Sequence, residues 1–503
     1  MSLHAGVSHA VRHRPDATAL IVQGRRVTFA ELWSQVGGIA AGLLDRFGEP
    51  PPRIAVMSGP RLLGFAGALA CSVLGAAWVP INPAHPRDRV AAILRSAEPG
   101  AVVCEQEDVP LLEAAARAAG VEERVPFLVS PPSGSSVPEE SPGEGFAYIF
   151  FTSGSTGSPK GVPITRANLQ AFLDWVGARY RLSPEDVVAQ FSDLSFDLSI
   201  LSTFGAWAGG AAVAVLDRRD MVLAPERTLG RAGCSAWVSV PSLARLLSAR
   251  RGLRPGAFPG LRLSLFCGEA LPRDVVEEWQ TAAPDSVIEN LYGPTEATVA
   301  CFAYSWDGGT SPSRCANDVV PIGHPMPGTL AAIVDPEHGR PADSGELLLG
   351  GTQCFAGYWR DARRTAASLV RLGDSAKVYY RTGDLVRRDA DGCLHFVGRA
   401  DRQIKVNGHR VELGDIEAAM NALPGVRATA ALGWPVVGLT AEGVAAFVVS
   451  EECEPATLRS RLRDALPAYM MPSRVQVLPE LPLTANGKTD YRALITLLEG
   501  ARG

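Results

Sequence analysis

The stretch Phe151–Val162, FTSGSTGSPKGV, is the part of the sequence that says most about the fold. An apolar strand runs into a loop of small and hydroxyl-bearing residues, which ends in Pro159, Lys160 and Gly161. Small residues let a backbone wrap around a phosphate, and amide N–H groups, hydroxyls and a lysine ammonium can then bind its oxygens. The sequence does not fit the Walker A pattern GxxxxGK[ST], so it predicts another kind of phosphate loop behind a buried strand.

Short apolar segments alternate with amphipathic segments on both sides of this loop. The alternation predicts an α/β fold with largely parallel sheets. Strands are expected at Arg53–Met57, Ala101–Cys104, Ala147–Phe151, Ala212–Leu216 and Leu261–Phe266. Between about 300 and 400 the turns are closer together, and strands at Glu346–Leu349 and Leu394–Val397 predict a small β-barrel-like part. The 503 residues would make about three folding units at ~150 residues each.

The composition excludes several classes of protein. A net charge of −5 gives no electrostatic basis for nucleic-acid binding. Nine cysteines without a CxxC pair disfavour a disulfide framework and a zinc site, and they fit a cytoplasmic protein. The stretch Leu62–Pro86 lacks Asp, Glu, Lys and Arg, but it is rich in Gly and Ala and is interrupted by VPINP. It therefore predicts a buried helix near 62–74 and a strand at 77–81, and no membrane association.

Five further motifs follow the phosphate loop in order. They are Asn290–Glu296 (NLYGPTE), Tyr379–Leu385 (YYRTGDL), Gly398–Glu412 (GRADRQIKVNGHRVE), Leu466–Pro472 (LPAYMMP) and Thr484–Asp490 (TANGKTD). Together with the phosphate loop, they make the sequence resemble the adenylate-forming superfamily, which includes acyl-CoA synthetases, luciferases and the adenylation domains of nonribosomal peptide synthesis. The resemblance extends over nearly the whole chain.

This resemblance implies that the protein joins a carboxylate to AMP, using ATP and Mg²⁺ to provide a leaving group and to screen the repulsion between anions. It assigns the β- and γ-phosphates to Thr152, Ser153, Gly154, Ser155, Thr156, Gly157 and Lys160. The adenine and its pocket wall are assigned to Gly268, Glu269, Ala270, Asn290, Leu291 and Tyr292. Asp384 would bind the ribose hydroxyls, Arg399 the ribose or phosphate, and Thr295 would lie beside the α-phosphate. Glu296 would be a Mg²⁺ ligand.

The resemblance also implies two domains that move against each other. Residues 1–400 would form the core with the ATP and substrate sites, and residues 401–503 a small mobile α+β domain. Lys488 would be the catalytic lysine that bridges the substrate carboxylate and the α-phosphate. Asp401 matches the hinge, while Lys405 and Gly408 would face the site after rotation and form the path of a thiol arm.

The segment FDLS at Phe196–Ser199 indicates which acids are activated. In amino-acid-activating members an Asp at this place pairs with the substrate ammonium, and a buried unpaired carboxylate is costly, so Asp197 implies a cationic group opposite. The resemblance gives a mostly apolar pocket of Leu198, Leu201, Ser239, Leu265, Cys267, Leu291, Gly293, Val299 and Ala300, with Lys488. This lining predicts a small neutral amino acid. Alanine is expected first, by similarity to D-alanine–carrier protein ligases; glycine, serine, proline and a β-amino acid remain open, as does chirality.

The acceptor is expected to be a separate carrier protein with a phosphopantetheine thiol, because the 15 residues after Lys488 leave no room for a carrier domain. The setting expected for such a ligase is secondary-metabolite biosynthesis. Two alternatives remain open at this point. One is an acyl-CoA synthetase for a small carboxylic acid, against which Asp197 argues. The other is a nucleotide-binding regulatory protein without catalysis, against which Lys488, Glu296 and Asp384 argue.

Overall fold

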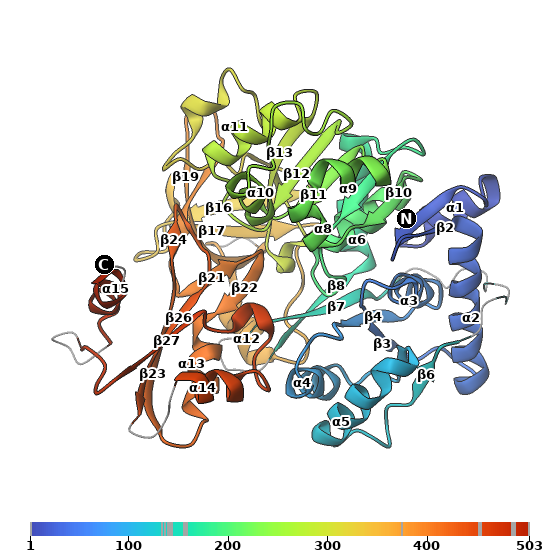
Figure 1. The fold of residues 1–503 in the computed structure, drawn as a ribbon, viewed down its shortest axis with the longest axis horizontal. Coiled ribbons are helices and arrows are strands. Elements are labelled where there is room, and N and C mark those ends of the chain that lie inside the picture. The colour runs from blue at the N-terminus through green and yellow to red at the C-terminus, as the bar shows by residue number, and fades with distance from the viewer. Residues whose placement is uncertain are drawn as a thin grey trace.

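A computed structural model of the chain describes residues 3–131, 134, 137, 144–153, 159–373, 376–450, 455–483 and 489–500. It has the mixed α/β architecture expected from the sequence. Two large sheets lie beside each other with helices packed on them, and a smaller β-rich part and a C-terminal part complete the molecule (Figure 1). The strands expected from the sequence are present, and each of their ends lies within two residues of the expected position.

The largest sheet has nine strands. Its order is β15 (His324–Pro325), β14 (Phe302–Ser305), β13 (Val287–Tyr292), β12 (Leu263–Cys267), β11 (Ala236–Ser239), β9 (Val187–Gln190), β10 (Ala212–Val215), β1 (Thr18–Val22) and β2 (Arg25–Thr28). The strands from β13 to β1 pair in parallel, and antiparallel strands complete both edges. The carboxyl ends of β9, β11, β12 and β13 therefore lie along one edge, where open α/β sheets bind their ligands.

The second sheet has six strands and contains the start of the phosphate loop. Its order is β6 (Phe127–Val129), β5 (Ala101–Cys104), β3 (Arg53–Met57), β4 (Ala77–Ile81), β7 (Phe146–Thr152) and β8 (Lys160–Thr165). Strand β7 pairs antiparallel with β8, so that Thr152 lies opposite Lys160 and the two ends of the loop meet. The uncharged stretch forms a buried helix and then β4, as expected.

The β-rich part is a five-stranded antiparallel sheet. It consists of β16 (Thr329–Val334), β17 (Ser344–Gly351), β18 (Leu369–Arg371), β19 (Val378–Arg388) and β20 (Leu394–Arg399). The long strand β19 pairs with β17 along one side, and with β18 and β20 in turn along the other. Asp384 on β19 therefore lies directly opposite Arg399 on β20.

The C-terminal part begins with the hairpin β21 (Gln403–Val406) and β22 (His409–Glu412). A three-stranded sheet follows, with β23 (Val426–Gly433), β26 (Val444–Ser450) and β27 (Arg474–Leu478), and a small hairpin of β24 (Val436–Val437) and β25 (Thr440–Ala441). Helices α13 and α14 pack on one face of the three-stranded sheet and α15 on the other. In Figure 1, α15 lies on the side of this sheet away from the rest of the molecule.

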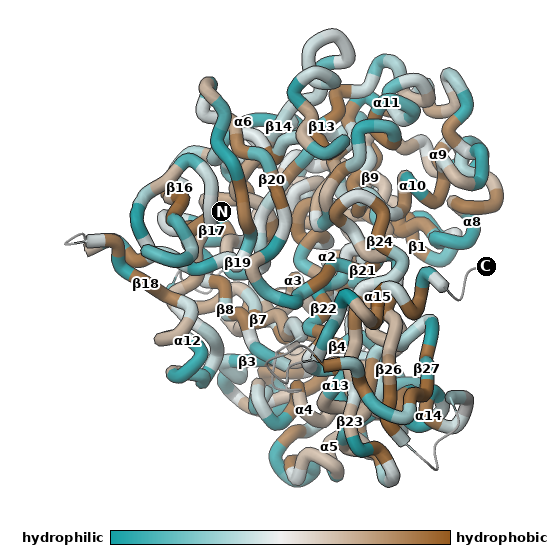
Figure 2. Tube along the Cα trace, turned by 90° about the vertical axis from the view of Figure 1, so that its left-hand side faces the viewer, coloured by the Kyte–Doolittle hydropathy of each residue, from teal (hydrophilic) through white to brown (hydrophobic). Residues whose placement is uncertain are grey.

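The helices cover the sheets and bury their apolar sides. They are α1 (Ala5–His13), α2 (Phe29–Phe47), α3 (Leu62–Val73), α4 (Arg87–Ala97), α5 (Val109–Ala119), α6 (Arg166–Tyr180), α7 (Ala206–Ala208), α8 (Arg218–Leu223), α9 (Pro225–Ala232), α10 (Pro241–Ala249), α11 (Arg273–Ala282), α12 (Ala362–Ser368), α13 (Leu413–Asn421), α14 (Pro455–Leu462) and α15 (Tyr491–Gly500). Figure 2 shows hydrophobic stretches along the inner strands and hydrophilic residues on many outer turns. Capping boxes start α2 at Thr28 and α6 at Thr165, which satisfies N–H groups that a helix leaves free.

Among the described helices, none is both long and apolar enough to cross a membrane. Helix α3, the most apolar of them, has 12 residues and is packed in the main core. The eight described cysteines are all free thiols.

Candidate active site

Several of the residues expected to bind substrate follow the carboxyl ends of three parallel strands of the nine-stranded sheet, β9, β12 and β13. Asp197 lies in the loop after β9, Gly268 and Glu269 directly follow β12, and Thr295 and Glu296 lie just after β13. Because these strands run parallel in one sheet, with β11 between β9 and β12, their following loops meet at one edge of the sheet. The five-stranded sheet and the hairpin β21–β22 close this edge from the other side and contribute Asp384, Arg399, Lys405 and Gly408.

Two cavities lie at this edge and share part of their walls. The larger has a volume of about 280 Å³, and its lining includes the expected residues Gly268, Glu269, Ala270, Asn290, Leu291, Tyr292, Gly293, Asp384, Arg399, Asp401 and Lys405. The smaller has a volume of about 50 Å³, and its lining includes Asp197, Leu198, Cys267, Gly268, Gly293, Thr295, Val299, Asp384, Arg399, Lys405 and Gly408. The structure therefore brings together residues from motifs about 200 positions apart.

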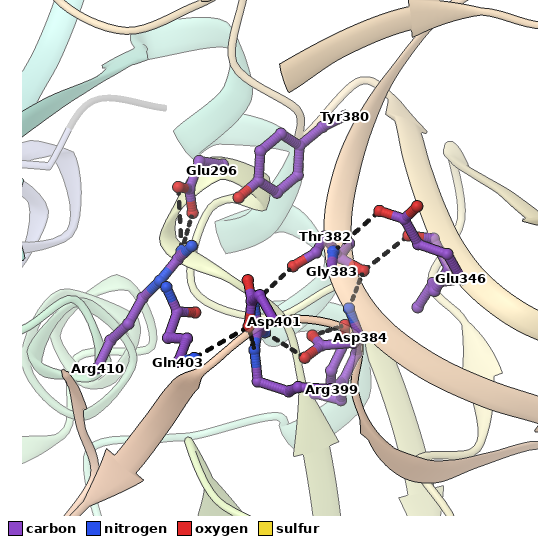
Figure 3. Close-up of polar contacts among 12 residues, drawn as sticks. Glu296, Glu346, Tyr380, Thr382, Gly383, Asp384, Arg399, Asp401, Gln403 and Arg410 are labelled. Carbon is purple, nitrogen blue, oxygen red and sulfur yellow. Dashed lines mark hydrogen bonds and ion pairs between the residues drawn. The ribbon is translucent and has the colours of Figure 1, made fainter. Parts of the chain in front are cut away.

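Asp384 forms the polar centre of the 280 Å³ cavity. The residue is 4% exposed, and its carboxylate accepts a hydrogen bond of 2.5 Å from the Tyr292 hydroxyl and a second one from Arg399. Arg399 also pairs with Asp401 at 2.7 Å (Figure 3). Burial would lower the pKa of Arg399, but Asp401 and Asp384 raise it above its ordinary value. Both carboxylates are therefore held in place as hydrogen-bond acceptors, which suits recognition of a diol.

Asn290 presents an unsatisfied acceptor to the same cavity. Its side-chain amide donates to the carbonyl oxygens of Val320 and Pro321 at 3.3 and 2.9 Å. Its Oδ1 is buried and has no hydrogen-bond partner among the described residues. A buried acceptor without a partner is costly, so this atom suits a ligand that brings an N–H group, such as an adenine amine.

Asp197 forms one wall of the 50 Å³ cavity and is 7% exposed. No basic side chain of the described residues lies within ion-pair distance of its carboxylate. Burial raises the pKa of Asp197 to about 6, against the opposing effects of a hydrogen bond with Thr295 and the charge of Lys405. The site therefore contains a buried carboxylate that no described basic side chain contacts directly, and a further cation beside it would stabilise its ionised form.

The expected pocket residues divide into two groups. Leu198, Cys267, Gly293 and Val299 line the 50 Å³ cavity, and the Cys267 thiol lies 4.0 Å from the Val299 carbonyl oxygen. The other residues expected there, Leu201, Ser239, Leu265, Leu291 and Ala300, are buried but are not among its lining residues. The Ser239 hydroxyl is engaged within the core, since it accepts from Trp237 and donates to the Val240 carbonyl.

A buried charged cluster surrounds Glu296, which is fully buried. Its carboxylate lies 3.3 Å from the Lys160 ammonium and accepts a hydrogen bond of 2.7 Å from the Tyr358 hydroxyl. Arg410 on β22 donates to both of its oxygens at 3.0 Å (Figure 3). Burial would raise the pKa of Glu296, but Arg410 and Lys160 hold it well below its usual range. Burial and then Arg410 lower the pKa of Lys160 to about 8.

The phosphate loop is described only at its two ends. Thr152 and Ser153 end one side and Lys160 begins the other, and the Ser153 hydroxyl donates to the backbone carbonyl of Arg410 at 2.6 Å. Gly154, Ser155, Thr156 and Gly157 lie outside the described residues. Lys488 also lies outside them. Its described neighbours Leu483 and Thr489 form a β-bridge with each other, and neither lines the two cavities.

The hairpin β21–β22 reaches the site through Gly408. Its N–H donates to the Glu269 carboxylate at 2.6 Å, and its φ is +81°. A Cβ atom here would come within 2.3 Å of a Val240 methyl group, so the close contact requires glycine. Beside it lies a cavity of about 190 Å³ that reaches from Asp197 along the stacked rings of His409 and Tyr469. This cavity connects the buried carboxylate with the boundary between the hairpin and the core.

The residues around Glu296 can accommodate Mg²⁺ if Arg410 withdraws. Mg²⁺ is commonly held by one or two carboxylates together with substrate phosphates, and Glu296 lies beside the two ends of the phosphate loop. In the described arrangement, both of its oxygens are occupied by Arg410. Arg410 lies inside the motif GRADRQIKVNGHRVE, but the sequence pattern alone assigned it no role.

A second group of possible metal ligands lies apart from the cavities, and the sequence did not predict it. Ligand atoms of Asp389, Cys393 and His395 lie within 4.8 Å of one another. The Asp389 carboxylate already pairs with Arg314 at 2.8 Å and with His395 at 3.1 Å. The Asp389 carboxylate therefore already has a cationic partner, Arg314, within the protein.

Comparison with known families identifies two matching segments. Residues 7–359 match the family of AMP-binding enzymes, and residues 415–488 match the AMP-binding enzyme C-terminal domain. The chain is 33% identical over 512 residues to enterobactin synthase component F of Escherichia coli (strain K12). The alignment covers 98% of the chain but 39% of that relative, so the chain spans about two fifths of the relative's length.

Three solved structures share the fold over nearly the whole chain. The Vibrio cholerae adenylation domain AlmE, in complex with glycyl-adenosine-5'-phosphate, has a TM-score of 0.87 and 26% identity, with 99% of this chain and 98% of that one covered. Holo-PA1221, which contains adenylation and PCP domains, has a TM-score of 0.81 and 26% identity, with 98% and 84% covered. A malonyl-CoA ligase with methylmalonyl-CoA and AMP bound has a TM-score of 0.78 and 27% identity, with 95% and 99% covered.

Proposed function

Since the chain belongs to the family of AMP-binding enzymes, and specifically to the adenylate-forming superfamily, we propose that it activates a small neutral amino acid. Alanine is the first candidate, followed by glycine, serine and proline. In the first step a carboxylate oxygen of the amino acid attacks the α-phosphorus of ATP, and pyrophosphate leaves. In the second step a phosphopantetheine thiol of a separate carrier protein attacks the acyl carbon, AMP leaves with the former carboxylate oxygen, and the thiol proton is released.

The observation that carries this proposal is the environment of Asp197. Its buried carboxylate borders a 50 Å³ cavity and has no ion-pair partner among the described side chains. An α-ammonium supplies the missing charge, whereas a simple carboxylic acid would leave the carboxylate uncompensated. The small volume supports a small side chain. The glycyl-adenosine-5'-phosphate in complex with AlmE, a neighbour in fold, is in keeping with this size.

The nucleotide is assigned to the 280 Å³ cavity. We assign the ribose hydroxyls to Asp384 and the adenine amine to the unpartnered Oδ1 of Asn290. Glu296 and the nucleotide phosphates would hold Mg²⁺, which when bound would screen the negative charge of the triphosphate. Lys160 and the phosphate loop would bind the β- and γ-phosphates.

We further propose that the chain works as two domains, 1–400 and 401–503, that rotate about Asp401. In the described arrangement the hairpin tip at Gly408 faces the site, and the 190 Å³ cavity beside it would accommodate the thiol arm. Adenylation would require a different orientation, in which Lys488 reaches the α-phosphate.

Amino-acid-dependent exchange of pyrophosphate into ATP tests the first step. A panel of glycine, both enantiomers of alanine and serine, proline and β-alanine should give a response with at least one small amino acid, and the Asp197→Asn variant should lose it. A matched control is Asp186→Asn, which changes a carboxylate that pairs with Arg262 away from both cavities. A wild-type enzyme that responds to none of these acids would refute the proposal.

The runner-up function is an acyl-CoA synthetase for a small carboxylic acid, which the likeness to the malonyl-CoA ligase favours. The two functions differ in acceptor as well as in acid. Incubation with ATP, the activated acid and either free CoA or a set of holo carrier proteins distinguishes them. Loading of a carrier supports the first proposal, and loading of free CoA with an acid that lacks an amino group supports the second.

A further inference from the structure

A further cavity, of about 330 Å³, lies at the end of the phosphate loop, where Lys160 begins β8. Its walls come from α4, from the start of β8 and from the segment that leads into α12, and the two helices lie beside each other in Figure 1. All of its described lining residues belong to the core and none to the C-terminal part. The described walls therefore do not depend on how the C-terminal part is oriented.

The lining of this cavity carries more positive than negative charge. One carboxylate, Asp361, lines it together with four cationic side chains, which are Arg95, Lys160, Arg360 and Arg364. Arg364 lies 3.4 Å from Asp361, and Arg360 lies 2.5 Å from Glu98 nearby. The cationic groups outnumber these two carboxylates by two. A concave surface with excess positive charge attracts anions, so the cavity suits a small anion with several negative charges.

Two aromatic rings hold three of these cations in place. The Lys160 ammonium lies 5.2 Å and the Arg364 guanidinium 5.9 Å from the centre of the Tyr358 ring. The Arg360 guanidinium lies 5.5 Å from the centre of the Trp359 ring. A ring face attracts a cation without cancelling its charge. The cationic groups are therefore positioned before an anion arrives and keep their charge for it.

Lys160 joins this cavity to the buried cluster around Glu296. Its ammonium lies 3.3 Å from the Glu296 carboxylate. Lys160 lines the 330 Å³ cavity and is not among the described residues that line the cavities assigned to the nucleotide, the amino acid and the thiol arm. The exposed fraction of the side chain rises from 6% at Lys160 to 19% at Arg364 and 49% at Arg360. A row of cations thus leads from the buried cluster to the surface.

We propose that this cavity binds pyrophosphate and is the path by which it leaves the active site after adenylation. Arg364 and Arg360 would take over its oxygens from Lys160 through charge-assisted hydrogen bonds. Since the described walls belong to the core, pyrophosphate would not have to displace the C-terminal part in order to leave. The inference rests on the proposed function for the identity of the anion. The charge and the position of the cavity rest on the contacts themselves.

Pyrophosphate exchange tests the path, because in this assay the first step also runs backward. Pyrophosphate attacks the α-phosphorus of the aminoacyl-AMP, ATP forms, and the amino acid leaves as its carboxylate. In the double variant Arg360→Gln, Arg364→Gln, kcat/KM for pyrophosphate should fall about 10-fold, the order expected when steering charges are lost. The kcat/KM values for ATP and for the amino acid should stay within about 2-fold. Added salt should lower kcat/KM for pyrophosphate more in the wild type than in this variant.

The matched control is the double variant Arg227→Gln, Arg231→Gln. It removes the same charge from α9, where both arginines line a different cavity, and it should leave all three kcat/KM values within about 2-fold. An unchanged kcat/KM for pyrophosphate in the Arg360→Gln, Arg364→Gln variant would overturn the proposal. An equal fall for ATP would overturn it as well, because the arginines would then serve the triphosphate and not the leaving pyrophosphate.

Direct binding separates this inference from the proposed function. Calorimetric titration of the ligand-free wild type with magnesium pyrophosphate should show binding, and the Arg360→Gln, Arg364→Gln variant should bind about 10-fold more weakly. Equal affinity in the two proteins would overturn the proposal. A wild-type protein without amino-acid-dependent exchange contradicts the proposed function, while the titration still tests the cavity. Should the double variant unfold, as a lower melting temperature would reveal, the more exposed Arg360→Gln alone carries both tests, with a fall of about 3-fold expected.

Discussion

Replacing Asp197 by Asn is expected to lower the enzymatic activity and to raise the free energy of unfolding. The reason is that the ionised carboxylate is buried and no basic side chain among the described residues forms an ion pair with it. Burial raises its pKa from the ordinary 3.8 to about 6. A difference of about two pH units corresponds to about 3 kcal/mol. Since the folded-state pKa is raised, the cost to the folded protein is absent below about pH 3.8 and fully developed above about pH 6.

The variant should therefore be more stable than the wild type by up to about 3 kcal/mol at pH 8. Between about pH 6 and pH 4 this gain should shrink by about 1.4 kcal/mol per pH unit. Urea unfolding curves of both proteins at pH 8, 6, 5 and 4 measure it. The slope with pH is the specific readout, because the packing of the new amide does not titrate.

Activity should change in the opposite direction. Loss of a buried charge partner costs about 2–5 kcal/mol, so kcat/KM for the amino acid in pyrophosphate exchange should fall by about 30-fold to several thousand-fold. In the wild type, kcat/KM for the amino acid should fall as the pH drops below about 6, because protonated Asp197 no longer attracts the substrate ammonium. Asp186→Asn provides the contrast: burial would raise the pKa of Asp186, but Arg262 and Ser235 lower it to about 2, so this variant should be less stable at pH 7.

An Asp197→Asn protein whose stability relative to the wild type does not depend on pH would refute this reasoning. Normal exchange kinetics in that variant would refute it equally. The first result would mean that the carboxylate is not desolvated, and the second that no substrate cation meets it.

Three further predictions concern the same site. Gly408→Ala should keep pyrophosphate exchange but reduce carrier loading at least about 10-fold, because the added Cβ would lie 2.3 Å from a Val240 methyl group. The double variant Gly408→Ala, Val240→Ala should recover part of the loading rate. Cys267→Leu should fill the 50 Å³ cavity and lower kcat/KM for alanine more than for glycine, measured by exchange; equal losses for both would contradict the assignment of the pocket. Glu296→Gln should destabilise the protein by about 3–5 kcal/mol in urea unfolding, because it leaves the buried Lys160 and Arg410 without their carboxylate, and an unchanged midpoint would count against the cluster.

The sequence by itself determined the class of the protein and the positions of its candidate site residues relative to the strands. The apolar strand that leads into FTSGSTGSPKGV, and the motifs behind β13 and in β19 and β20, are local features. A parallel α/β sheet brings the carboxyl ends of its strands together whatever the details of packing, so residues behind those ends could be expected to meet. Three of the four lysines, Lys160, Lys405 and Lys488, also stand inside these motifs in a chain that otherwise uses Arg.

Only the tertiary structure decided which charges pair. Arg410 and Glu296 are 114 positions apart, and Tyr292 and Asp384 are 92 apart. Neither pair has a spacing signature, because contacts between residues so far apart in the chain depend on how whole elements are oriented and not on local conformational preference. For the same reason the pattern could not separate Leu198 and Cys267, which line the cavity, from Leu201 and Leu265, which lie buried outside its lining. The volume of a pocket and the partner of a buried charge are set by the packing of whole elements, which local patterns in the sequence do not determine.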